Sequence, residues 1–273
     1  MPIDLWALDC LGIEGWKMLC PICNERANVV GAFKDTPILR CAASDCGFRF
    51  FDLSRWSSPY DGEDYYGSYV PTDLIVEPCT LARVASIRKF RADGRLAELG
   101  CGSGATALAF KEAGYDVTAV DESTQFTTFL SERYPEIAWV DSAIGRFLEG
   151  APKAFDILTM FHVLEHIPEP RQVVEQLDGA LRPGGIILIE VPDVGGGRAR
   201  IQGKTWEYYL DHHINYFDTR SLKKLFGLHG YRAVGVQRTY HYGYPQGKAV
   251  DDAIRGALAW MGYNSIVRMV FQK

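Results

Sequence analysis

Between residues 95 and 192 the sequence alternates short apolar segments with segments of helical periodicity, and this alternation restricts the fold more than any other feature. Strands that are separated by helices pair in parallel, and the helices cover both faces of the resulting sheet. We therefore predict an α/β fold. The strands are expected at residues 95–99, 116–121, 137–140, 155–161 and 184–192.

The first expected strand leads into a glycine-rich stretch, ELGCGSGATA at residues 98–107. Glycines in such a stretch let the backbone approach a ligand closely at the N-terminus of the following helix. Gly100, Gly102 and Ala105 satisfy the pattern of dinucleotide-binding loops. Asp121 ends the second strand, where an acid can accept from both ribose hydroxyls. The loop alone therefore fits a dinucleotide as well as another nucleoside.

Two acidic residues favour an aminoacyl nucleoside over a dinucleotide. Glu98 lies inside the first strand, where a carboxylate suits a cationic amino-acid tail better than a pyrophosphate. Asp141 follows the third strand, where it could accept from the exocyclic amine of adenine. The stretch LRPGGIILIE at residues 181–190 then provides a Gly-Gly turn into a fifth strand.

From about residue 93 to residue 273 the chain resembles the class I S-adenosylmethionine-dependent methyltransferases. ELGCGSG resembles the glycine loop of that family, VTAVDES its ribose acid, FDILTMFHVLEHIPEP its fourth strand with the following loop, and LRPGGIILIEVP its fifth strand. The resemblance implies a Rossmann-like, mostly parallel sheet of seven strands that ends in a reversed C-terminal hairpin. The segments YRAVGVQRT and SIVRMVFQK fit the two strands of this hairpin.

The same resemblance implies a donor site for S-adenosylmethionine, whose product is S-adenosylhomocysteine. By position, the loop glycines lie beside the methionine portion, Asp121 binds ribose and Asp141 faces adenine. Cys101 belongs to this loop, and its alternative role is simply that of a small residue that fits there. The full set of expected donor-site residues is Glu98, Gly100, Cys101, Gly102, Gly104, Asp121, Glu122, Asp141, Ser142, Phe161 and His162.

Four cysteines near the N-terminus have the layout of a zinc ribbon. Cys20 and Cys23 form a CxxC pair, and Cys41 and Cys46 return after a short apolar hairpin with a looser spacing. Two pairs of thiolates can complete a tetrahedral zinc site. A segment this small cannot bury enough apolar surface to be stable alone, so a bound metal ion would stabilise it. We predict a structural zinc ion. Four free buried thiols or a redox pair are the alternatives.

These features divide the chain into three expected parts. A zinc-ribbon module covers residues 1–57, and a linker or lid with a helix covers residues 58–92. The methyltransferase domain covers residues 93–273 and carries an acceptor-side insertion at about 193–218. Three tyrosines of the linker could close over the site, namely Tyr65, Tyr66 and Tyr69.

The segment TWEYYLDHHINYFD, at residues 205–218, follows the fifth strand and is rich in titratable and aromatic side chains. It resembles the His-Glu-His-x-Ser-Tyr-Phe segment of bacterial sugar C-methyltransferases, which also carry an N-terminal zinc module. It resembles more closely the Glu-His-x-Asn-Tyr-Phe segment of methyltransferases from polysaccharide and natural-product clusters. The resemblance implies O- or C-methylation of a small polar acceptor, such as a sugar, a nucleotide-linked sugar or a natural-product intermediate.

Histidines supply the candidate catalytic residues. His213 occupies the position of the second histidine in the sugar-enzyme segment, whereas His212 stands where that segment has glutamate. A neutral imidazole can accept a proton near pH 7, so His213 is the candidate general base. His212 and His166 are the next candidates. Each of these histidines could instead serve as a structural hydrogen-bond partner.

Charge and composition restrict the partners and the location. The net charge of -5 and the pI near 5.7 provide no basic footprint for nucleic acid, which disfavours the alternative of a zinc-ribbon ribosomal RNA methyltransferase. The N-terminal stretch has no basic leader, and no apolar run is long enough to span a bilayer, so we expect a cytoplasmic protein without a membrane partner. A nicotinamide-dependent oxidoreductase and a non-catalytic donor-binding module are further alternatives. The sequence does not indicate an oligomeric state.

Overall fold

A computed structural model describes residues 18–56, 78–239 and 263–273. Of the linker expected at residues 58–92, residues 58–77 with the three tyrosines lie outside the described residues, and so do residues 240–262. Within the described part of the chain, no helix is long and apolar enough to cross a membrane.

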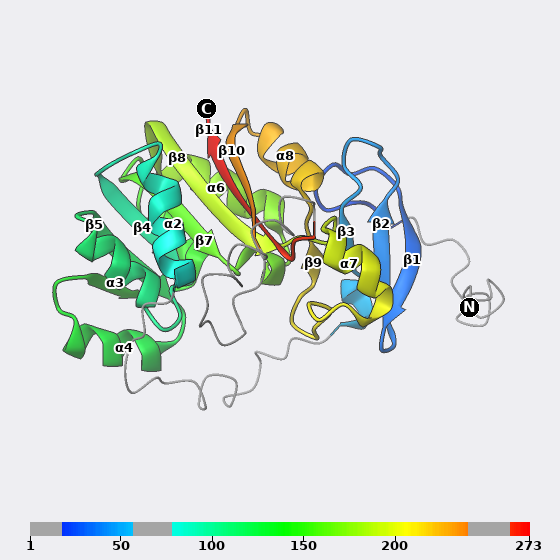
Figure 1. Ribbon diagram of the computed structural model, residues 1–273, viewed down its shortest axis with the longest axis horizontal. Helices are drawn as coiled ribbons and strands as arrows, with labels where there is room; N and C mark the ends of the chain where they lie inside the picture. Colours follow the sequence, from blue (N-terminus) through cyan, green and yellow to red (C-terminus); the bar gives the residue numbers. More distant parts are fainter. Residues whose placement is uncertain (1–17, 57–77, 240–262) are drawn as a thin grey trace.

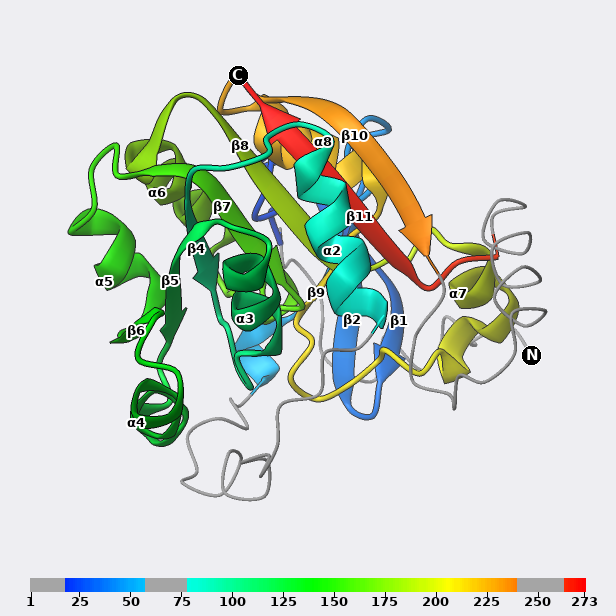
Figure 2. The ribbon, with the colours of Figure 1, turned by 60° about the vertical axis from the view of Figure 1, so that its left-hand side comes forward.

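A seven-stranded sheet forms the centre of the molecule (Figures 1 and 2). The strand order is β10-β11-β8-β7-β4-β5-β6. The central strands pair in parallel, and β11 runs antiparallel to both β8 and β10. The predicted α/β class and mostly parallel sheet are therefore confirmed, with β11 as the reversed member of the C-terminal hairpin. The strands are β4 (Arg95–Leu99), β5 (Asp116–Asp121), β6 (Ala138–Asp141), β7 (Phe155–Phe161), β8 (Leu181–Pro192), β10 (Arg232–Thr239) and β11 (Ile266–Gln272).

Helices cover both faces of this sheet, as Figure 2 shows. On one face, α2 (Pro78–Arg88) and α3 (Ala105–Glu112) pack over a cluster of buried apolar side chains. On the other face lie α5 (Ile144–Glu149), α6 (Pro170–Ala180) and α8 (Thr219–Gly227). Every residue of β7 is buried, because this central strand has neighbours on both edges and both faces. The helix α4 (Thr124–Arg133) follows β5 at the β6 edge of the sheet.

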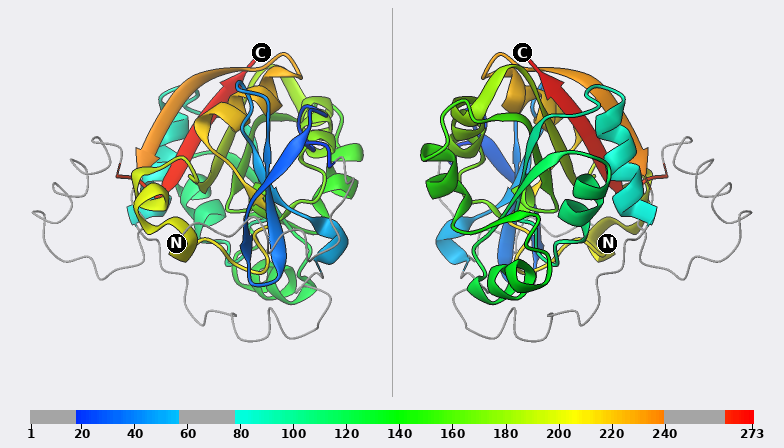
Figure 3. Two further views of the ribbon diagram at one scale, coloured as in Figure 1. Left: turned by 90° about the vertical axis from the view of Figure 1, so that its right-hand side faces the viewer. Right: turned by 90° about the vertical axis from the view of Figure 1, so that its left-hand side faces the viewer.

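A second, antiparallel sheet holds the N-terminal part of the chain (Figure 3). It contains β1 (Ala27–Phe33), β2 (Thr36–Cys41) and β3 (Arg49–Phe51). Its fourth strand, β9 (Asn215–Tyr216), comes from the segment predicted to lie over the acceptor. The short helix α7 (Gly197–Gln202) lies between β8 and β9 in the chain. The acceptor-side segment is thus built into the N-terminal sheet.

The two sheets share one hydrophobic core. Phe217 follows β9 and is fully buried, and its ring lies 4.9 Å from the ring of Phe48 between centroids. The same buried cluster includes Phe226 of α8 and side chains of the main sheet. At the surface, the Lys224 ammonium of α8 lies 2.6 Å from the Asp45 carboxylate. The N-terminal sheet is therefore fixed against α8.

Phe217→Ala is expected to lower the free energy of unfolding by about 3–5 kcal/mol, because it leaves a cavity where the two sheets share their core. Urea denaturation followed by circular dichroism measures this loss. Leu228→Ala at the end of α8 serves as the control, since that side chain is 47% exposed and its loss should change the stability by no more than about 0.5 kcal/mol. Equal effects of the two substitutions would contradict a shared core.

Candidate active site

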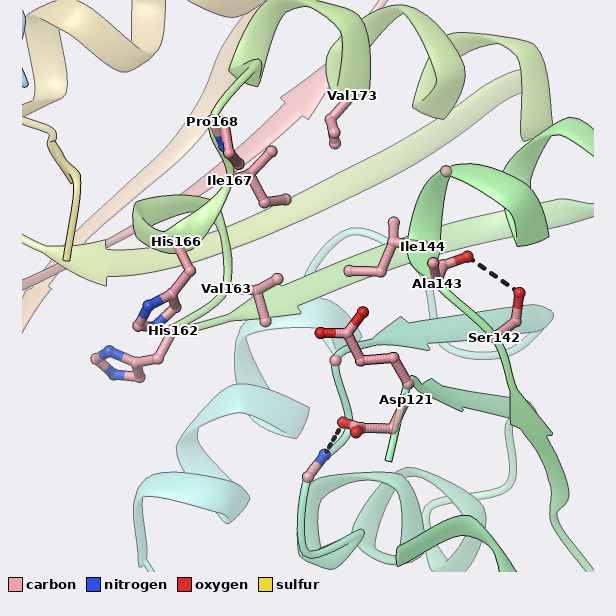
Figure 4. Close-up of a pocket in the computed structure, with 14 residues that line it drawn as sticks. Asp121, Ser142, Ala143, Ile144, His162, Val163, His166, Ile167, Pro168 and Val173 are labelled. Atoms are coloured by element: carbon pink, nitrogen blue, oxygen red, sulfur yellow. Dashed lines mark hydrogen bonds between the residues drawn. The ribbon is translucent and has the colours of Figure 1, made fainter. Parts of the chain in front are cut away.

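A cavity of about 530 Å³ lies at the carboxyl ends of β4, β5 and β7, where ligands bind in open parallel sheets (Figure 4). Its polar lining comes from the glycine loop, from the ends of β5 and β6, and from the loop after β7: Gly100, Gly102, Asp121, Glu122, Ser142, His162 and His166. Its apolar lining consists of Ala143, Ile144, Val163, Ile167, Pro168 and Val173. The cavity thus combines a polar side with an apolar wall.

The glycine loop needs its glycines for conformation and for space. Gly100 and Gly104 both have positive φ angles, of 75° and 79°. A Cβ atom on Gly100 would lie 2.5 Å from Val163 Cγ2, and one on Gly104 would lie 2.7 Å from the Trp139 ring. At Gly102, with φ of 48°, a Cβ would meet no atom within 4 Å among the described residues. The loop therefore packs tightly against Val163 and Trp139 and leaves open space at Gly102, which lines the cavity.

Asp121 holds the loop in this conformation. Its Oδ2 accepts a hydrogen bond of 2.8 Å from the Gly102 N–H, which Figure 4 marks, and its Oδ1 accepts one of 3.0 Å from the Ser123 N–H. The side chain lines the cavity and is buried. Each carboxylate oxygen has a second lone pair, so Asp121 can accept from a ligand hydroxyl without releasing the loop.

Glu98 is a buried carboxyl group two residues before Gly100, and it is not among the residues that line the cavity. Its Oε2 has no hydrogen-bond partner among the described residues. Burial raises the pKa of Glu98 to about 8, and Asp121 adds to this rise while Arg83 opposes it. A cationic group beside Oε2 would supply the missing partner and favour the ionised form. This unpartnered atom fits the ammonium group of an aminoacyl nucleoside.

Arg83 of α2 is a site residue that the sequence analysis missed. Its Nε and Nη2 donate to Glu190 Oε1 over 2.9 and 2.6 Å, and its Nη1 donates to Thr106 Oγ1 over 3.0 Å. The guanidinium carbon lies 4.5 Å from the centroid of the Phe161 ring. A cation thus lies against the first turn of α3, next to the glycine loop. The sequence around Arg83 carries no motif, so tertiary placement alone reveals it.

The other expected donor-site residues divide into two groups. Glu122, Ser142 and His162 line the cavity. Cys101 is buried, and Phe161 lies beneath Arg83. Asp141 is not among the residues that line the cavity, and its Oδ2 accepts from Thr124 Oγ1 over 2.7 Å. Their roles in binding a donor stay predictions.

Three histidines from two distant segments meet beside the cavity. His166 comes from the 3-10 turn Leu164–His166 after β7, and His212 and His213 precede β9. One ring nitrogen from each lies within 4.8 Å of the others. The His213 ring is centred 4.8 Å from that of His166 and 4.9 Å from that of His212. We call these three residues the histidine cluster. His166 also lines the cavity.

Backbone carbonyls orient two members of this cluster. His166 Nδ1 lies 2.8 Å from the carbonyl oxygen of His212, and His213 Nδ1 lies 3.0 Å from that of Tyr208. Burial, only partly opposed by Glu165, lowers the pKa of His213 to about 4. Its imidazole is therefore neutral and a weak proton acceptor at neutral pH.

Glu165 lies between the histidine cluster and the donor side, and the sequence analysis did not single it out. Its Oε1 lies 3.2 Å from His162 Nδ1, and its Oε2 is buried without a hydrogen-bond partner among the described residues. Burial opposes ionisation, yet neighbouring histidines hold the pKa of Glu165 below its usual value. His162 is raised to a pKa of about 9, against the effect of burial, by Glu165 and Glu190. Charge therefore alternates along this side of the cavity.

The four N-terminal cysteines also come together. Cys20 Sγ lies 3.8 Å from Cys46 Sγ, and Cys23 Sγ lies 3.4 Å from Cys41 Sγ. All four sulfurs lie within 4.8 Å of one another. Zinc–sulfur bonds of about 2.3 Å in a tetrahedron separate the sulfurs by about 3.8 Å, so this arrangement fits a zinc ion. Backbone N–H groups of Ala43 and Phe48 point at the second pair, as in metal–thiolate knuckles.

The sheet order and the glycine-loop cavity define a Rossmann-like protein with a methyltransferase fold. Residues 76–236 match a family model described as "Methyltransferase domain", so the chain belongs to this methyltransferase-domain family. This assignment gives no support to a nicotinamide-dependent oxidoreductase.

Curated relatives include two ubiquinone biosynthesis O-methyltransferases. The one from Idiomarina loihiensis is 31% identical over 139 residues, which are 50% of this chain and 54% of the relative. The one from a Caulobacter species is 27% identical over 154 residues, which are 50% of this chain and 61% of the relative. The chain thus spans little more than half the length of these relatives.

Solved structures agree on the fold. A methyltransferase from Archaeoglobus fulgidus superposes with a TM-score of 0.53 at 18% identity and covers 71% of this chain and 94% of its own. The 1,6-didemethyltoxoflavin-N1-methyltransferase of Burkholderia thailandensis, solved with S-adenosylhomocysteine, gives a TM-score of 0.52 at 17% identity. It covers 90% of this chain and 98% of its own.

Cys23→Ser is expected to lower the zinc content of the purified chain by about one ion, because a structural site needs all four ligands. Inductively coupled plasma mass spectrometry measures the content. Cys79→Ser changes a cysteine of α2 outside the cluster and should leave the zinc content unchanged. If Cys23→Ser retains as much zinc as the unchanged chain, the cysteines do not hold the ion.

Donor binding at pH 7 is expected to release about one proton, because Glu98 is mostly protonated below a pKa of about 8 and an ammonium group beside it favours the carboxylate. Calorimetric titration with S-adenosylmethionine in buffers of different ionisation enthalpy counts the protons.

Glu98→Gln should abolish this release and weaken binding by about tenfold to a hundredfold, since a hydrogen bond to a charged group contributes about 1.5–3 kcal/mol. The exposed Glu112 at the end of α3 provides the control, as Glu112→Gln should change neither quantity. Binding to the unchanged protein without proton release would place the donor's amino group elsewhere.

Proposed function

We propose that this protein transfers a methyl group from S-adenosylmethionine to a hydroxyl group of a small polar molecule. The observation that carries the proposal is that His166 lines the same cavity as Asp121 and the glycine loop. Groups suited to a nucleoside donor and groups suited to acting on an acceptor therefore face one space. Membership of the methyltransferase-domain family supports the reaction class.

The donor supplies a methyl group on a sulfonium, which is already electrophilic, so the protein has to bind, align and exclude water. Asp121 is placed for the ribose hydroxyls, and the apolar wall with Val163 and Ile167 is placed for the adenine ring. Arg83 is cationic, and Glu98 is a neutral acid that ionises when a cation lies beside it. We assign the donor's ammonium group to Glu98 and its carboxylate to Arg83.

Two observations bear on the acceptor. The names of the curated relatives specify O-methylation, which supports oxygen as the methylated atom. The acceptor-side segment resembles that of sugar and natural-product methyltransferases, which supports a sugar or natural-product intermediate. The net charge of -5 disfavours RNA as the acceptor.

We further propose that the four-cysteine cluster holds one structural zinc ion and that the protein works in the cytoplasm.

The acceptor hydroxyl must lose its proton as its oxygen attacks the methyl group. His166 of the histidine cluster lines the cavity and can promote this loss together with its neighbours, of which His213 is the most buried. Glu165 lies beside the cluster as a buried carboxylate that favours positive charge there. We therefore assign acceptor activation to the cluster.

His213→Ala is expected to reduce methyl transfer by about a hundredfold to ten-thousandfold, the contribution of a group that acts on a reacting proton, while leaving donor affinity unchanged. Labelled S-adenosylmethionine with a panel of sugars, nucleotide sugars and phenols, read by mass spectrometry, identifies the acceptor and measures the rate. Calorimetry measures donor affinity.

His229→Ala is the matched control, because His229 follows α8 and is not a member of the histidine cluster. A His213→Ala protein with full turnover would remove the cluster from the reaction. Donor binding by the unchanged protein with no transfer to any acceptor would favour a non-catalytic donor-binding module.

A further inference from the structure

We propose that the histidine cluster binds a divalent metal ion with the coordination preferences of zinc, at the acceptor end of the cavity. This site differs from the cysteine cluster in its ligands, because imidazole nitrogens with an open position are typical of catalytic zinc, whereas four thiolates are typical of structural zinc. The inference deepens the proposed function, on which its catalytic part rests. Metal binding itself is measurable without turnover.

The geometry of the cluster is close to that of a three-histidine site. One nitrogen of each of His166, His212 and His213 lies within 4.8 Å of the others. Zinc–nitrogen bonds of about 2.0–2.1 Å in a tetrahedron separate the nitrogens by about 3.4 Å, so the rings would move closer together around an ion. Two segments far apart in the sequence supply these ligands, so the fold has to hold them together.

Backbone contacts provide that hold. The Ile214 N–H donates to the Glu165 carbonyl over 3.0 Å, which ties the residue after His213 to the residue before His166. Asn215 Nδ2 donates to the Ile167 carbonyl over 2.6 Å, one residue further along on the first segment and two residues further along on the second. The ligand-bearing backbones are therefore fixed relative to each other, as a preorganised metal site requires.

The tautomers of two histidines suit coordination. A carbonyl oxygen can only accept, so Nδ1 of His166 and Nδ1 of His213 must carry the hydrogens in their bonds to the carbonyls of His212 and Tyr208. In a neutral ring the lone pair then lies on Nε2. Histidines that bind metals typically donate their other ring N–H to a carbonyl or carboxylate in this way.

A buried carboxylate provides the charge that such an ion needs. The Glu165 side chain is 1% exposed, and its Oε2 has no hydrogen-bond partner among the described residues. Glu165 directly precedes His166 in the 3-10 turn Leu164–His166. A divalent cation held by three neutral imidazoles would be stabilised by this charge, and the unpartnered oxygen would gain a counter-charge.

The ion would act on the acceptor. With three protein ligands, a fourth position is open for the acceptor hydroxyl, whose pKa falls on coordination. The hydroxyl proton leaves to water, and the oxygen's electron pair forms the new carbon–oxygen bond. The electron pair of the broken sulfur–carbon bond stays on sulfur, so the products are the methyl ether, S-adenosylhomocysteine and one proton. The imidazoles keep their lone pairs on the ion throughout.

The test loads the full chain with Zn²⁺ or Co²⁺, removes excess ion, and counts metal by mass spectrometry. The unchanged protein and His229→Ala are expected to hold about two ions per chain, and His212→Ala and His213→Ala about one. Cys23→Ser should also hold about one ion, at the histidines. Its Co²⁺ form should show the visible bands of nitrogen ligation without the near-ultraviolet charge transfer of thiolates.

His212 is the less buried of the two substituted histidines, so His212→Ala keeps the test valid if His213→Ala fails to fold. Donor affinity should be the same in both variants, which separates loss of the ion from failure of the proposed donor site. One ion per chain in the unchanged protein would overturn the proposal and leave His213 as a metal-free general base. Two ions in both histidine variants would overturn it as well.

Discussion

Ile214 connects three parts of the molecule through its two backbone groups. Its carbonyl accepts from the Phe51 N–H of β3 over 2.8 Å, and its N–H donates to the Glu165 carbonyl over 3.0 Å. The N-terminal sheet, the acceptor-side segment and the loop after β7 therefore meet at one residue. His213, which directly precedes it, takes its position from these bonds. The N-terminal sheet thus holds Ile214 from one side, and the bonds of Ile214 and Asn215 to the loop hold it from the other.

A charge network links the donor side to the sheet in a similar way. Glu190 of β8 accepts from Arg83 with one carboxylate oxygen and from Arg268 of β11 with the other. Although burial opposes it, the pKa of Glu190 is held well below its usual value by His162 and these two arginines. The reversed strand β11 thus contributes a charge as well as a strand to the sheet, because its Arg268 helps to keep Glu190 ionised for Arg83.

The sequence could predict the features that depend on local pattern. The strands Arg95–Leu99 and Phe155–Phe161 were predicted at their observed bounds, because apolar runs of that length between turns leave few alternatives. The glycine loop and Asp121 were predictable for the same reason, since their chemistry depends on neighbours in sequence. These two strands, the glycine loop and Asp121 all belong to the parallel part of the sheet, whose strands end at the cavity.

Features that depend on tertiary contact could not be predicted in this way. Arg83 lies in a helix without a motif, and Glu165 looked like an ordinary loop acid until burial left its Oε2 without a partner. The strand β9 has two residues, too few for any periodic pattern to appear. His166 and His212 are separated by the whole of α6, β8 and α7, so their approach follows from the pairing of β9 with β3.

That pairing also dictates an order of folding. Arg49 and Phe50 bond to Tyr216 and Asn215, so the N-terminal sheet lacks its last strand until synthesis has passed residue 216. During that interval the edge of β3 has unpaired N–H and C=O groups, of the kind that invite wrong partners. Contacts between residues so far apart in sequence form slowly, because the chain loses the entropy of closing a long loop before the contacts contribute any stability. The strands β1 to β3 are therefore synthesised long before the sheet that they belong to can be completed.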